Sequence, residues 1–171
     1  IFIDQSNYSR AITYFENALA IRKKQHDLPG IGSLYNKIGI VYQKQGKLKQ
    51  ALESQIQALK IYESLEEDKW VAYSLNNIAI IHQNLGNLDQ SLNYYEKAVG
   101  QRIKINDVYG EGMSYGNIAN VLVKLSDTSQ AITYYQKELG LFRSLNNTEA
   151  ISVQLSNLMP QGSCMFIRPW V

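Results

Sequence analysis

Residues 75–99 read LNNIAIIHQNLGNLDQSLNYYEKAV, and similar segments lie forty residues away on both sides. The segment before it, residues 35–59, reads YNKIGIVYQKQGKLKQALESQIQAL. The segment after it, residues 115–139, reads YGNIANVLVKLSDTSQAITYYQKEL. The three segments align without a gap. Self-similarity at a fixed period of this length indicates a repeat protein, in which each repeat is one supersecondary unit.

The first part of each repeat predicts an amphipathic helix. Apolar or small residues recur at the spacing i, i+3, i+4, i+7, which places them on one helix face. In the central repeat these residues are Leu75, Ile78, Ala79 and His82, of which only the histidine is polar. Gly46, Gly86 and Ser126 occupy the predicted helix end, where a left-handed residue commonly closes a helix.

A second helix is predicted directly after each of these turns. In residues 48–62 its core stripe is expected to be Leu48, Leu52, Ile56, Leu59 and Tyr62. In the next repeat the stripe is expected to be Leu88, Leu92, Tyr95 and Val99. Small residues at positions 39, 79 and 119 and at 11, 51, 91 and 131 allow the two helices of a pair to approach closely.

The small and aromatic positions resemble the tetratricopeptide repeat (TPR) signature. In two units the matching residues are Gly39, Tyr42, Gly46, Ala51 and Ala58, and then Ala79, Gly86, Ser91, Tyr95 and Ala98. The next unit keeps Ala119, Ala131 and Tyr135 but has Glu138 at a position that is usually small. The period of forty is similar to the long-helix TPRs of kinesin light chains, polarity adaptors and bacterial signalling proteins. The resemblance implies an all-α, right-handed superhelical solenoid of antiparallel helix pairs.

The repeat register divides the chain into units. We expect a truncated first unit at residues 1–28, which is mainly its second helix, followed by full units at 29–68, 69–108 and 109–148. Residues 149–159 are expected to form the first helix of a further, truncated unit, and residues 160–171 to form a tail outside the repeat.

Composition excludes several classes of function. Of the 171 residues 45% are hydrophobic and 19% charged, which is typical of a globular protein, and no apolar run is long enough to span a membrane. The formal charge is only +2 without a long basic run, which disfavours nucleic-acid binding. Cys164 is the single cysteine, and His26 and His82 lie far apart in sequence, so no metal-ligand spacing exists. We therefore expect no enzymatic activity, no cofactor and no metal site.

The first helices of a TPR solenoid line its concave wall, so the resemblance predicts a peptide groove along them. The residues opposite the core stripe supply amides, a few aliphatic groups and lysines. The expected groove residues are Asn36, Lys37, Ile40, Gln43, Lys44, Tyr73, Asn76, Asn77, Ile80, Gln83, Asn84, Met113, Asn117, Asn120 and Lys124.

Side-chain amides both donate and accept hydrogen bonds, so they suit the backbone of an extended peptide. In long-helix TPR proteins, asparagines at the columns of Asn77 and Asn117 commonly hold the main chain of the ligand, and the resemblance implies this role here. Alternatively, the amides reflect background composition, since the chain contains 28 Asn and Gln residues. The lysines are too few for the clamp that grips the acidic tails of chaperones.

The predicted function is a non-enzymatic scaffold or signalling adaptor in the cytoplasm, which binds an extended peptide or short helix of a partner protein. The alternative is a regulatory or oligomerisation segment of a larger signalling protein. In that case self-association through the chain ends is expected, by way of Leu155, Leu158 or the Phe166 and Trp170 tail.

Overall fold

The computed structural model describes the backbone of residues 5–145 and the side chains of residues 7–145. Within these residues the chain forms seven α-helices and no strand. The helices are α1 (Gln5–Lys24), α2 (Leu28–Lys44), α3 (Leu48–Ser64), α4 (Asp68–Asn84), α5 (Leu88–Lys104), α6 (Val108–Lys124) and α7 (Thr128–Ser144). The predicted all-α fold is confirmed.

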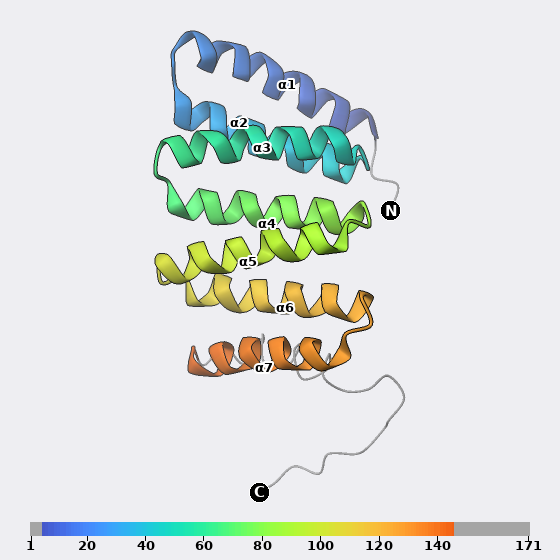
Figure 1. Ribbon diagram of the computed structural model, residues 1–171. Coiled ribbons are helices and arrows are strands. Elements are labelled where there is room, and N and C mark those ends of the chain that lie inside the picture. The colour runs from blue at the N-terminus through green and yellow to red at the C-terminus, as the bar shows by residue number, and fades with distance from the viewer. Residues whose placement is uncertain (1–4, 146–171) are drawn as a thin grey trace, which may run out of the picture.

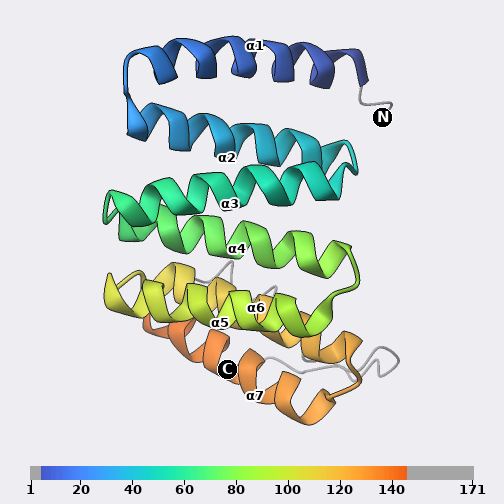
Figure 2. The same ribbon diagram turned by 45° about the horizontal axis from the view of Figure 1, so that its top comes forward.

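Each helix packs against the next one in the chain, and the seven helices stack in sequence order (Figures 1 and 2). The most extensive contacts join α2 with α3, α4 with α5, and α6 with α7. We call α2, α4 and α6 the first helices and α1, α3, α5 and α7 the second helices. The unit boundaries at 29–68, 69–108 and 109–148 stay predictions, and residues 149–159 and 160–171 lie outside the described part of the chain.

Short turns with a left-handed residue connect the helices. Gly46, Gly86 and Ser126 follow the first helices with φ values of 72°, 80° and 62°, as the sequence predicted. In the first of these turns Gly46 N–H donates to the Gln43 carbonyl and Lys47 N–H to the Tyr42 carbonyl, at 3.0 and 2.9 Å. This is the Schellman arrangement, which satisfies carbonyls that the helix end leaves free. His26, Glu66 and Asn106 play the corresponding part after the second helices.

The core of the second helices is narrower than the sequence predicted. In α3 the buried residues are Ala51, Ser54, Gln55, Ala58 and Tyr62, whereas Leu48, Leu52, Ile56 and Leu59 are only half-buried. In α5 the buried residues are Ser91, Tyr95, Ala98 and Val99, with Leu88 and Leu92 half-buried at the edge. Tyr62, Tyr95 and Val99 are buried as predicted, whereas the leucines and Ile56 are not, because the small residues expected at the helix contact occupy the line of closest approach.

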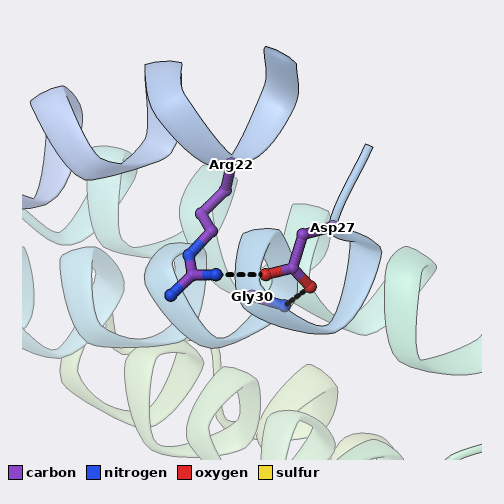
Figure 3. Close-up of polar contacts among 3 residues, drawn as sticks. All are labelled: Arg22, Asp27 and Gly30. Atoms are coloured by element: carbon purple, nitrogen blue, oxygen red, sulfur yellow. Dashed lines mark hydrogen bonds and ion pairs between the residues drawn. The ribbon is translucent and has the colours of Figure 1, made fainter. Parts of the chain in front are cut away.

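The junctions between a second helix and the next first helix follow two alternating patterns. Arg22 reaches from α1 to Asp27 Oδ2 at 2.8 Å, and Asp27 Oδ1 accepts from Gly30 N–H at 2.9 Å and so caps α2 (Figure 3). Eighty residues later Arg102, Asp107 and Gly110 repeat this arrangement at the start of α6.

Between these two junctions, Tyr62 and Trp70 occupy the positions of the arginine and the glycine. Their rings stack at 5.8 Å. At the two arginine junctions a Cβ added to Gly30 or Gly110 would collide with the neighbouring Asp and Arg side chains. An arginine at position 62 would likewise occupy the space that Trp70 needs. The bulky side chain at the start of α4 is therefore paired with an aromatic residue instead.

Candidate peptide-binding face

The predicted groove residues all lie on α2, α4 and α6, and we call the surface they form the first-helix face. Seven of them are exposed, namely Lys37, Lys44, Tyr73, Asn84, Met113, Asn120 and Lys124. Six are half-buried, namely Ile40, Gln43, Asn76, Ile80, Gln83 and Asn117. Asn36 and Asn77 are buried, with only 7% and 8% of their surface exposed.

Amide pairs connect successive first helices. Asn77 Nδ2 on α4 donates to Asn36 Oδ1 on α2 at 3.2 Å, and Asn117 Nδ2 on α6 donates to Asn76 Oδ1 on α4 at 3.3 Å. Both pairs join residues 41 positions apart, one period plus one residue. The amides thus hold the three first helices in register across the first-helix face.

The buried pair extends into the helix pair behind it. Gln55 on α3 is fully buried, and its Nε2 donates to the Asn36 backbone carbonyl at 3.1 Å and to Asn36 Oδ1 at 3.0 Å. Asn36 Oδ1 therefore accepts from both Gln55 and Asn77. Sequence reasoning did not assign Gln55 a role, although it is the one polar residue in a column otherwise formed by Phe15, Tyr95 and Tyr135.

Two buried tyrosines on the second helices hydrogen-bond to polar side chains of the first-helix face. Tyr135 on α7 donates its hydroxyl to Asn120 Oδ1 at 2.7 Å, and Tyr95 on α5 donates to Gln83 Oε1 at 3.4 Å. Burial raises the pKa of both hydroxyls, so both remain protonated donors at neutral pH. These contacts orient Asn120 and Gln83 and leave their NH₂ groups as hydrogen-bond donors.

Exposed apolar residues lie near the amino-terminal ends of α4 and α6. Trp70, Tyr73 and Met113 each expose 42% of their surface, and Tyr109 exposes 50%. Trp70 meets Tyr73 edge to face with ring centroids 6.0 Å apart. The sequence predicted Tyr73 and Met113 as groove residues but not Trp70 and Tyr109. Trp70 and Tyr109 lie in the first turn of their helices, within four residues of Tyr73 and Met113. This spacing in the sequence could have predicted that they lie near those two residues.

The remaining candidates for chemistry are two histidines and several residues outside the described part of the chain. His26 is exposed in a turn, and His82 is buried in the core column where the sequence placed it. Among residues 7–145 no group of three His, Cys, Asp or Glu side chains could hold a metal ion. None of the seven described helices combines the length and hydropathy that crossing a bilayer requires. Cys164, Leu155, Leu158, Phe166 and Trp170 lie outside the described residues.

Residues 1–64 and 70–144 match the tetratricopeptide repeat family. Because the match covers most of the sequence, the chain belongs to this family. No curated protein sequence matches the chain significantly.

Solved structures with this fold are similar to the chain at low sequence identity. BtubC (BKLC) from P. vanneervenii is 18% identical with a TM-score of 0.75, covering 88% of this chain and 64% of that one. The Rap conjugation gene regulator of plasmid pLS20, solved with the Phr* peptide, is 19% identical with a TM-score of 0.75, covering 92% and 44%. The N-terminal domain of stress-induced protein-1 from C. elegans is 18% identical with a TM-score of 0.62, covering 75% and 95%. The chain thus spans less than two thirds of the first two proteins.

Proposed function

We propose that this chain is a protein-interaction scaffold that binds an extended peptide or a short helix of a partner across the first-helix face. The observation that carries the proposal is the continuity of this face. The pairs Asn36–Asn77 and Asn76–Asn117 link α2, α4 and α6, so exposed groups from three helices are held at fixed spacing. A ligand that contacts all three helices would meet a preorganised surface, which lowers the entropic cost of binding.

The chemistry of the face suits a peptide. The exposed side chains of Trp70, Tyr73, Tyr109 and Met113 offer apolar contact area, and aromatic residues are enriched among those that dominate binding energy at interfaces. The amides of Gln83, Asn117 and Asn120 offer hydrogen bonds to a peptide backbone. Membership of the tetratricopeptide repeat family supports an interaction role, and the Rap regulator of similar fold was solved with a peptide.

The test uses exposed residues, because Asn77 and Asn117 also hold the first helices together. The double variant Tyr73→Ala, Met113→Ala removes apolar contacts of the face. The matched control is Tyr14→Ala, Ile132→Ala, which removes two exposed side chains from the second helices α1 and α7. Both variants should keep the helicity and melting temperature of the parent chain.

The parent chain is first used to capture partner proteins. The sequence of a captured partner is then synthesised as overlapping peptides. The affinity of each peptide for the parent chain and for the two variants is measured by calorimetry. We expect the face variant to bind the active peptide at least about tenfold more weakly, as loss of two interface anchors implies, and the control to bind like the parent. Equal binding by the parent and the face variant would reject this face as the site.

The cytoplasmic location, the signalling-adaptor role and the absence of catalysis stay predictions from the sequence. The alternative of a regulatory or oligomerisation segment also stays a prediction, because the residues expected to mediate self-association lie outside the described part of the chain.

A further inference from the structure

Within residues 5–145, α7 lacks the counterpart of the helix that follows α3 and α5. Both α3 and α5 contact their own first helix and also the next first helix in the chain. Residues 149–159 continue the repeat in sequence. Ile151 takes the position of Val71, which is buried on α4. Leu155 takes the position of Leu75, which is buried on the same helix. This segment therefore has the apolar residues that a first helix needs to pack on α7.

Side-chain hydrogen bonds link successive first helices at a fixed place in the repeat. The pairs Asn36–Asn77 and Asn76–Asn117 each join residues 41 positions apart. The next pair in this series would join positions 116 and 157. Residue 157 is asparagine and supplies the donor, whereas residue 116 is glycine and has no side-chain acceptor. The series is therefore interrupted at its acceptor.

Glu138 on α7 brings an acceptor to this place. A Cβ added at Gly116 would lie within 2.6 Å of both carboxyl oxygens, so the carboxyl takes the space of the absent side chain. Glu138 is only 6% exposed, and its Oε2 has no hydrogen-bond partner among the described residues. Asn36 is buried to a similar degree, and its Oδ1 is nevertheless reached by an asparagine of the next first helix. A buried acceptor at this place is thus suited to a donor from a packed helix.

We propose that residues 149–159 pack on α7 as the next first helix, and that the Glu138 carboxyl accepts a hydrogen bond from Asn157 Nδ2. A carboxyl group accepts hydrogen bonds whether or not it is protonated, so it replaces the amide oxygen that an asparagine at position 116 would supply. With the segment placed in this way, Val153 takes the position of Tyr73 and Met113. The first-helix face then continues onto a fourth helix, whichever ligand the face binds.

Amide hydrogen exchange of the full chain, followed by NMR, tests this packing. The backbone amides of residues 149–159 should be protected from exchange, because a packed helix opens only through local unfolding. Asn157→Ala should lower this protection about tenfold, the upper end of what one net hydrogen bond contributes. The matched control is Gln161→Ala, which removes a side-chain amide beyond the segment and should leave the protection unchanged.

Two backgrounds show whether Glu138 is the acceptor. In Glu138→Ala the acceptor is absent, so Asn157→Ala should have no further effect. In Gly116→Asn, Glu138→Ala an asparagine again supplies the acceptor, so the tenfold loss on Asn157→Ala should return. The proposal is overturned if the segment is unprotected in the parent chain, or if Asn157→Ala behaves like the control. It is also overturned if the effect of Asn157→Ala persists in the first background or stays absent in the second. Protection that rises with protein concentration would overturn it too, since the segment would then pack on a second copy.

Discussion

The carboxyl group of Glu138 on α7 fills the space that a side chain at Gly116 on α6 would occupy. A Cβ added at Gly116 would lie 2.5 Å from Glu138 Oε1 and 2.6 Å from Oε2. In the preceding repeats the position of Gly116 is held by Asn36 and Asn76, and the position of Glu138 by the fully buried Ala58 and Ala98. In the preceding repeats the larger residue of the pair lies on the first helix, whereas here it lies on the second helix. The two differences together keep the total side-chain volume of the pair nearly constant.

This reversed arrangement predicts strong coupling between the two positions. Gly116→Asn alone should lower the free energy of unfolding by about 1–3 kcal/mol, because the new side chain overlaps the Glu138 carboxyl. In a Glu138→Ala background the same change should be neutral or stabilising, since it restores the pattern of the preceding repeats. Urea denaturation of the four proteins of this cycle gives the coupling energy. Additive effects of the two changes would contradict the packing of this pair.

Burial of Glu138 predicts a pH dependence of stability. Only 6% of this residue is exposed, its Oε2 has no hydrogen-bond partner, and burial raises the pKa of the carboxyl from 4.5 to about 7. Between these values the unfolded chain releases the proton while the folded chain keeps it, so the free energy of unfolding falls as pH rises from about 4.5 to 7. Glu138→Gln should therefore raise the free energy of unfolding by about 2–3 kcal/mol at pH 8 and much less at pH 5. The measurement is denaturant unfolding at both pH values, and a gain that is the same at both would show that ionisation is not the cause.

The amide network predicts unequal effects at equivalent asparagines. Asn36→Ala removes the buried side-chain acceptor that Gln55 Nε2 and Asn77 Nδ2 share and leaves Gln55 Nε2 only the Asn36 backbone carbonyl, so it should destabilise by about 1–3 kcal/mol. Asn76→Ala, one repeat later, removes only the half-buried acceptor of Asn117, and it should cost about 0.5–1 kcal/mol. Thermal and urea unfolding compare the two variants, and equal losses would argue against the buried Gln55 network.

The turn after α6 predicts a stabilising substitution. Ser126 has a φ of 62° where the equivalent turns have glycine, and L-residues other than glycine are strained in this region. Ser126→Gly should raise the free energy of unfolding by about 0.5–1 kcal/mol, whereas Gly86→Ala should lower it by about 1 kcal/mol. A Cβ at Gly86 would meet no atom within 4 Å, so its effect is that of the backbone alone. Melting temperatures measured by circular dichroism should move in opposite directions.

The regular part of this protein could be predicted from sequence because it depends on local patterns. The forty-residue period, the helix faces at positions 75, 78, 79 and 82, and the turns at Gly46, Gly86 and Ser126 all follow from residues close in the chain. The core of the second helices was harder to predict. The small residue Ala51 was expected at the helix contact, but hydrophobicity favoured Leu52 and Ile56 over Gln55, which is buried because its amide hydrogen-bonds to Asn36.

The roles of individual polar side chains needed the tertiary structure. The sequence predicted that Asn36 and Asn77 face a ligand, but the distance between their side chains shows that they also satisfy each other and Gln55. The sequence alone determined a TPR solenoid and the helices that form its faces, since these depend on periodicity and on backbone conformation at the turns. Only the tertiary structure decided which amides pair and where Glu138 fits against Gly116. Each of these relations joins residues on different helices, and its energy depends on distances of a few ångströms that no spacing along the chain fixes.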